Sequence, residues 1–143
     1  MLGSLLKPPA VIELWSDLGG GKTTFVRGLA RGFGSHDRVS SPTFTLNKIY
    51  KAEDSEIHHF DFYRLSDPGV VSDQLEESLQ NDRVITVVEW SDIVRGVLPA
   101  ARLVIEFQPV QDNPDERNIT IHYPQSLRAI ITELESRLAE SEP

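Results

Sequence analysis

The chain has 143 residues, of which 39% are hydrophobic, and this favours one domain with a packed core. Its formal net charge of −8 argues against charge-driven binding to a nucleic-acid backbone, and the absence of cysteine excludes disulfides, cysteine zinc sites and thiol catalysis. Because the N-terminus is too weakly apolar for a signal peptide and no apolar run approaches the roughly 20 residues of a membrane span, we expect a soluble cytoplasmic protein with no membrane association.

The first part of the chain predicts a strand, a helix and two further strands. Residues 11–15 (VIELW) are short, apolar and β-favouring, which indicates a buried strand. Residues 23–33 (TTFVRGLARGF) place apolar side chains at helical spacing, and Gly34 marks a helix end. Residues 44–50 (FTLNKIY) and 56–63 (EIHHFDFY) predict two strands joined by a charged turn.

The second part predicts alternating helices and strands before a hairpin. A helix is expected to open at residues 66–69 (SDPG), and residues 84–90 (VITVVEW) indicate a buried strand. A short helix is expected between Ser91 and Pro99. Residues 102–110 and 117–123 flank the polar turn DNPDE and predict a β-hairpin.

A last helix is expected over residues 125–140, whose apolar stripe favours packing on the core rather than binding to a partner. Strands and helices alternate through the first half, and an antiparallel hairpin closes the series. The sequence therefore predicts a three-layer α/β fold with a mostly parallel sheet and an antiparallel edge.

Residues 16–23 (SDLGGGKT) match a phosphate-binding loop except at its first position, where Ser16 replaces glycine. Glycines allow backbone N–H groups to approach phosphates, and the N-terminus of the following helix favours anions. Lys22 is expected to reach the β- and γ-phosphates, and the Thr23 hydroxyl to bind Mg²⁺. A glycine-rich turn with an exposed lysine is the alternative. Serine can replace the first glycine if its backbone angles are ordinary, because that position serves the turn leaving the strand.

Two acids end predicted strands and are candidates to complete the site. Mg²⁺ prefers oxygen ligands, and Glu89 and Asp61 are placed to supply or support them. A solvated acid at a strand end is the ordinary alternative for each. Thr43 resembles a switch threonine that senses the metal or the γ-phosphate, or is a polar residue after a proline turn. His58 and His59 point to opposite faces of a strand, which predicts one core and one surface histidine and no metal pair.

Four separated motifs occur in one order along the chain. They are SDLGGGKTTFVRGLARGFG (16–34), SSPTFTLNKIY (40–50), HHFDFYRLSDP (58–68) and VVEWSD (87–92). From about residue 11 to about residue 108, the chain resembles the TsaE family (formerly YjeE), bacterial ATPases needed to make threonylcarbamoyladenosine in tRNA.

This resemblance implies a P-loop NTPase-like fold that binds and hydrolyses ATP with Mg²⁺. It implies that Thr23 and Glu89 hold the metal, that Asp61 acts with Glu89 in hydrolysis, that Thr43 lies in a switch-like segment and that Trp90 shapes the site. The residues expected to bind the nucleotide phosphates are Asp17, Gly19, Gly20, Gly21, Lys22, Thr23 and Thr24.

The resemblance also implies partners. TsaB and TsaD perform the transfer to tRNA, and ATP hydrolysis resets their complex, so we expect weak hydrolysis by the chain alone and no direct grip on tRNA. The usual loop of the family reads GDLGAGKT, from which Ser16 and Gly20 depart; Gly20 is expected to be sterically harmless. The family normally has a strand and a helix before the first core strand, so residues 1–143 are expected to form one domain with these elements absent or truncated.

Two other functions use the same loop. A small-molecule kinase needs an acceptor pocket and usually a basic lid, and Arg64 is the only basic residue inside the motifs HHFDFYRL and VVEW. A nucleotide-dependent binding module without hydrolysis is the other alternative, favoured by Ser16.

Overall fold

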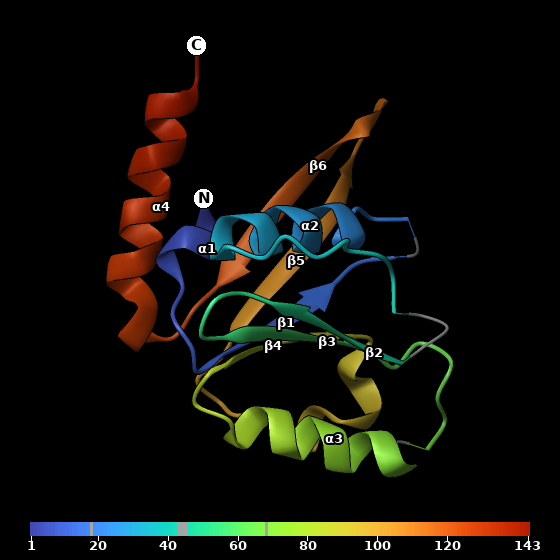
Figure 1. Cartoon of the computed structure of the whole chain (residues 1–143). Coiled ribbons are helices and arrows are strands. Elements are labelled where there is room, and N and C mark those ends of the chain that lie inside the picture. The colour runs from blue at the N-terminus through green and yellow to red at the C-terminus, as the bar shows by residue number, and fades with distance from the viewer. Residues whose placement is uncertain (18, 43–45, 68) are drawn as a thin grey trace.

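The computed structural model describes residues 1–17, 19–42, 46–67 and 69–143. A six-stranded sheet with the order β2-β3-β4-β1-β5-β6 runs through the molecule (Figure 1). Strands β3, β4, β1 and β5 are parallel, whereas β2 and β6 are antiparallel edges. The expected sheet is confirmed, with an antiparallel strand at both edges. The strands are β1 (Ala10–Trp15), β2 (Asn47–Lys51), β3 (Glu56–Asp61), β4 (Val84–Glu89), β5 (Leu103–Val110) and β6 (Asn113–His122).

Helices cover both faces of this sheet, as Figure 1 shows, and confirm the three layers. One face carries α1 (Leu2–Leu5), α2 (Lys22–Phe33) and α4 (Arg128–Ser141), the last preceded by a 3-10 turn, η3 (Gln125–Leu127). The other face carries α3 (Gly69–Gln80) and two 3-10 turns, η1 (Ser91–Ile93) and η2 (Arg95–Val97). None of the helices in the described part of the chain has both the length and the apolar character needed to cross a membrane.

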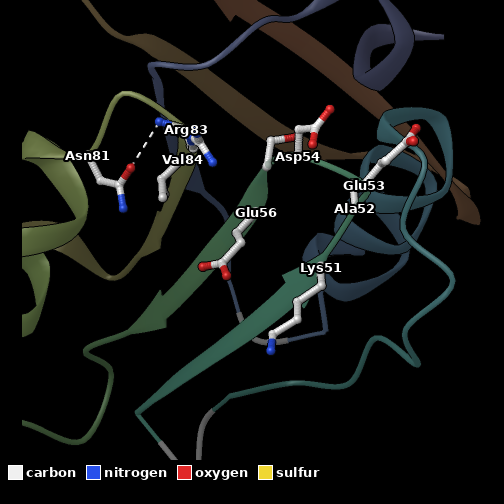
Figure 2. Close-up of a pocket in the computed structure, with 9 residues that line it drawn as sticks. Lys51, Ala52, Glu53, Asp54, Glu56, Asn81, Arg83 and Val84 are labelled. Atoms are coloured by element: carbon white, nitrogen blue, oxygen red, sulfur yellow. Dashed lines mark hydrogen bonds between the residues drawn. The ribbon is translucent and has the colours of Figure 1, made fainter.

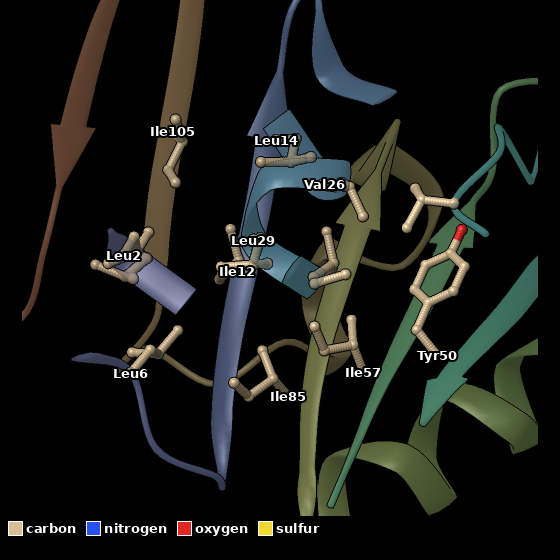
Figure 3. Packing of buried hydrophobic residues seen from close by; sticks show 14 of the residues in the cluster. Leu2, Leu6, Ile12, Leu14, Val26, Leu29, Tyr50, Ile57, Ile85 and Ile105 are labelled. Atoms are coloured by element: carbon tan, nitrogen blue, oxygen red, sulfur yellow. The ribbon is translucent and has the colours of Figure 1, made fainter. Parts of the chain in front are cut away.

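The core has one cluster of apolar side chains on each face. In the larger cluster, Ile12 and Ile85 of the sheet face Leu2 and Leu29 of the helices, as Figure 3 shows. Every residue of β4 is buried, because this strand lies inside the sheet and is covered on both faces. The central strands are therefore held firmly, and their carboxyl ends form a fixed edge on which side chains can be placed.

Three local predictions differ from the structure. Helix α1 was not expected, and its Leu2 joins the core. The segment after β4 forms η1 and η2 instead of one short helix, since a few residues rarely offset the cost of starting an α-helix. The hairpin turn is tighter than DNPDE: β6 already begins at Asn113, and Asp112 takes a left-handed conformation (φ 64°), which aspartate tolerates.

Candidate nucleotide phosphate site

The described loop residues, 16, 17 and 19–21, lie between β1 and α2, as the sequence predicts. Gly19 (φ 75°) and Gly21 (φ 96°) adopt left-handed conformations that favour glycine, and Gly21 is the N-cap of α2. The chain therefore curls back before the helix starts. Lys22, the first residue of α2, folds over this curl and donates hydrogen bonds from Nζ to the carbonyl oxygens of Ser16 (3.1 Å) and Asp17 (3.5 Å).

A cavity of about 280 Å³ opens above the loop. It brings together most of the residues predicted from separate motifs, and Ser41 adds a wall that the sequence reading did not include. Asp17 is not among the lining residues, but its carbonyl oxygen accepts a hydrogen bond from Lys22, and Thr43 lies outside the described residues. The lining residues are Gly19, Gly20, Gly21, Lys22, Thr23, Thr24, Ser41, Asp61, Glu89 and Trp90.

The two predicted carboxylates lie side by side at the edge of the sheet. Asp61 ends β3 and Glu89 ends β4, and the two residues are direct neighbours in the parallel register. Both are 3% exposed. Asp61 Oδ1 accepts a hydrogen bond from the backbone N–H of Tyr63 (2.9 Å), which fixes that side chain. Two buried acids facing one lysine make a site that can attract a cation.

Lys22 is buried between these acids and an aromatic ring. Its Nζ lies 4.4 Å from the centre of the Trp90 ring. Burial lowers the pKa of Lys22, and Glu89, Asp61 and Asp17 partly offset this effect. Trp90 is held over the lysine by a left-handed backbone (φ 55°), a conformation unusual for a large side chain, and its ring also contacts Tyr63.

Behind Glu89 lies a histidine whose contact the sequence reading missed. The prediction of one core histidine is confirmed: His59 is fully buried and His58 is partly exposed. His59 Nε2 lies 2.6 Å from Glu89 Oε2. The spacing of residues in the strand could have indicated this contact. Residues two apart in a strand share a face, so His59 lies on the same face as Asp61 and toward the end of β4.

The two departures from the usual TsaE loop touch each other. Ser16 adopts an ordinary backbone angle, since the described residues with positive φ other than glycine are Leu46, Trp90 and Asp112. A Cβ added at Gly20 would overlap the Ser16 hydroxyl and lie 2.7 Å from the Ser16 Cβ. Gly20 is therefore a steric requirement of Ser16 in this chain.

A second cavity of about 400 Å³ adjoins the other side of the loop. The loop glycines and Thr24 line both cavities, so the two spaces meet there. Phe25 and Phe107, whose rings are 5.5 Å apart, form its apolar wall, and Arg117 of β6 reaches across to the Gly19 carbonyl oxygen (3.5 Å).

A third hollow, of about 310 Å³, lies at the opposite end of the strands, around the β2–β3 turn (Figure 2). Lys51, Glu53, Asp54 and Arg83 line it, so charges of both signs face it. It has neither a glycine loop nor a helix N-terminus, and no paired buried acids are among its lining residues. We therefore place the candidate site at the loop.

The donor groups at the loop fit Mg²⁺ bound together with phosphates. Thr23 and Glu89 offer a hydroxyl and a carboxylate to the same cavity. Within the described ranges, no three His, Asp or Glu side chains form a ready cage for a metal. Mg²⁺ rarely needs such a cage, because it keeps several waters and uses one or two protein ligands with substrate phosphates.

The chain is similar to known proteins over most of its length. The family model for threonylcarbamoyl adenosine biosynthesis protein TsaE matches residues 1–119. The tRNA threonylcarbamoyladenosine biosynthesis protein TsaE of Haemophilus influenzae is 37% identical over 111 residues, 78% of this chain and 68% of that protein. The Bacillus subtilis protein of the same name is 37% identical over 120 residues, 84% of this chain and 73% of its own length.

A solved structure gives the same result for the fold. The crystal structure of Bacillus subtilis YdiB superposes with a TM-score of 0.73 at 32% sequence identity, covering 95% of this chain and 83% of that one. The motifs, the sheet order and these matches point the same way. The chain belongs to the TsaE family, which acts in tRNA threonylcarbamoyladenosine biosynthesis.

Proposed function

We propose that this protein binds ATP with Mg²⁺ and hydrolyses it, as an accessory ATPase of tRNA threonylcarbamoyladenosine formation that acts with TsaB and TsaD. One observation carries the proposal: a single cavity joins the glycine loop, Lys22 and two buried carboxylates on neighbouring strands. A glycine-rich turn with an exposed lysine does not account for this, because Lys22 is 8% exposed and faces both acids.

The roles follow from the chemistry of each group. Gly19, Gly20, Gly21 and the N-terminus of α2 line the space where phosphates would lie, and Lys22 adds a positive charge. Thr23 and Glu89 would hold Mg²⁺, which neutralises phosphate charge when bound. Asp61 is placed to orient water, since its neighbour Glu89 already serves the metal.

The second cavity suits the nucleoside half of the ligand. It meets the phosphate cavity at the loop glycines and Thr24, and it offers the aromatic wall of Phe25 and Phe107 to a flat base. Arg117 lies at its rim. The phosphate cavity is open on one side, so a partner protein can complete its wall and exclude water. The net charge of −8 fits a component that leaves tRNA binding to other proteins.

The direct test is to measure nucleotide binding and turnover. We expect ATP binding that strengthens with Mg²⁺ in calorimetry, and hydrolysis that rises when TsaB and TsaD are added. Glu89→Ala should weaken the Mg²⁺-dependent part of binding, and Asp61→Ala should lower turnover more than affinity. Lys51→Ala, a lysine change at the remote hollow of Figure 2, should alter neither.

Three results would count against the proposal. Equal, metal-independent affinities in the wild type, Glu89→Ala and Asp61→Ala would remove the site. Transfer of phosphate to a small molecule in place of water would support a kinase. Tight ATP binding without turnover, even with both partners, would support a binding module.

A further inference from the structure

We propose that His59 is a positioning residue that orients the Glu89 carboxylate. This inference rests on the proposed function, in which Glu89 holds the metal. Three contacts lie along one path: His59 Nε2 lies 2.6 Å from Glu89 Oε2, His59 Nδ1 lies 3.4 Å from the Tyr50 hydroxyl, and that hydroxyl donates a hydrogen bond to the Ser40 carbonyl oxygen (2.9 Å).

The path lies in the interior. His59 is fully buried, and Tyr50 and Glu89 are nearly so. Polar groups in such a place are held by one another, because water does not compete for their hydrogen bonds. A carboxylate that holds a metal offers only acceptors, so the proposal places the ring proton of His59 on Nε2, as the donor to Glu89. Nδ1 then faces Tyr50 without a proton, and because the one Tyr50 hydroxyl proton is donated to Ser40, His59 and Tyr50 are in packing contact only.

This arrangement restricts the rotation of the carboxylate. Oε2 is committed to His59, which leaves Oε1 as the oxygen that would contact Mg²⁺. Partners of this kind, which hold a metal ligand without touching the metal, typically change metal affinity about 10- to 100-fold when they are removed.

The other end of the path lies beside the segment that leads to Ser41. The Ser40 hydroxyl accepts a hydrogen bond from Lys48 Nζ (2.5 Å), and its carbonyl oxygen accepts one from Tyr50. The next residue, Ser41, lines the cavity. Strand β2 therefore anchors the segment that leads to Ser41, and Tyr50 of this strand packs against the His59 ring.

The first experiment separates orientation from simple packing. His59→Leu removes the donor, whereas His59→Gln can place an amide N–H near the position of Nε2. We expect His59→Leu to weaken the Mg²⁺-dependent part of ATP affinity by about 10- to 100-fold while the Mg²⁺-free affinity stays unchanged, and His59→Gln to recover most of the loss. His58→Leu, on the opposite strand face, is the matched control and should behave as wild type.

The second experiment uses no ligand. Nitrogen NMR of the four histidines in the free protein should show His59 with its proton on Nε2, and this resonance should shift in Glu89→Gln. A proton on Nδ1, or a His59 signal that ignores Glu89→Gln, overturns the inference. This measurement decides the question if His59→Leu does not fold.

The two proposals can fail separately. If the wild type binds no ATP, the proposed function fails. If the wild type binds Mg²⁺–ATP and His59→Leu shows the same Mg²⁺ dependence, the function stands and the positioning role is wrong. If His59→Gln is as weak as His59→Leu, only packing of the ring is involved and the positioning role is again wrong.

Discussion

Two buried glutamates on neighbouring strands of this sheet have opposite surroundings. Glu13 of β1 is fully buried, and both of its oxygens accept hydrogen bonds: Oε1 from Trp15 and Ser91, Oε2 from Arg102 (2.6 Å). Glu89 of β4 is equally buried, but it lines a cavity with Lys22 and has His59 behind it.

The difference shows how one residue type serves stability in one place and binding in another. Burial alone would raise the pKa of Glu13, but the hydrogen bonds from Ser91, Arg102 and Trp15 outweigh it, so the pKa lies below its usual value. In the region of Glu89 burial is the stronger effect, because it lowers the pKa of Lys22 despite three nearby acids. The first region stabilises the fold, and in the proposed function the second region binds Mg²⁺ and the phosphates of the nucleotide.

Matched amide substitutions should give the largest contrast. Glu13→Gln removes the charge that pairs with Arg102 and replaces one acceptor by an amide N–H₂, which neither Arg102 nor Trp15 can accept, so we expect a loss of about 3 kcal/mol in the free energy of unfolding, as for other broken buried pairs. Glu89→Gln keeps an oxygen for His59 and should cost less than about 1 kcal/mol. Denaturant unfolding measures both. Equal losses would show that the two acids contribute equally to the stability of the fold, which would contradict the contrast.

Removing the cation of each region should give a second contrast, with an effect on ATP affinity at Lys22 and on stability at Arg102. Lys22→Ala should reduce ATP affinity about a hundredfold or more, roughly 2.7 kcal/mol, with little change in stability. Arg102→Ala should cost about 1–3 kcal/mol of stability and leave ATP affinity near wild type, because Ser91 and Trp15 still donate to Glu13. Calorimetry and thermal unfolding test the pair, and unchanged ATP affinity in a folded Lys22→Ala protein would refute the site.

Substitutions in the glycine loop, which lies between Glu13 and Lys22 in the chain, should change ATP affinity by a smaller factor. Gly20→Ala should lower ATP affinity about tenfold, roughly 1.4 kcal/mol, because the new Cβ collides with Ser16. Ser16→Gly alone should change affinity by less than tenfold, and adding it to Gly20→Ala should restore binding. Gly21→Val is the control: its strain comes from φ 96°, so Ser16→Gly should not rescue it. Additive effects of Ser16→Gly and Gly20→Ala would contradict the contact.

Lowering the pH should give the smallest effect, a gradual loss of stability. The pKa of Glu13 is lower in the folded protein than in the unfolded chain, so its contribution to stability is present above the unfolded value, near 4.5, and is lost as the pH falls through the folded value. We expect the wild type to lose stability faster than Arg102→Ala over this range. Parallel unfolding curves against pH would show that the pair with Arg102 is not responsible.

The two regions also differ in how far the sequence predicts them. The loop, Asp61 and Glu89 can be found locally, since each lies where an apolar run ends. Glu13 carries no such mark: it sits inside VIELW, and its partners Ser91 and Arg102 are 78 and 89 residues away. The contact of Ser16 with Gly20 also needs the folded loop, because spacing alone does not show that a side chain at one position fills the space of the other.

The tryptophan held over Lys22 gives the site an optical reporter. Trp90 lines the cavity with its ring 4.4 Å from the lysine Nζ, and the chain has one other tryptophan, Trp15, which stacks with Arg95 outside that cavity. Indole emission responds to nearby charge, so a phosphate that draws Lys22 away should change the fluorescence of Trp90 before any product forms. Ligand binding at the site can thus be followed in real time by intrinsic tryptophan fluorescence, without an added label.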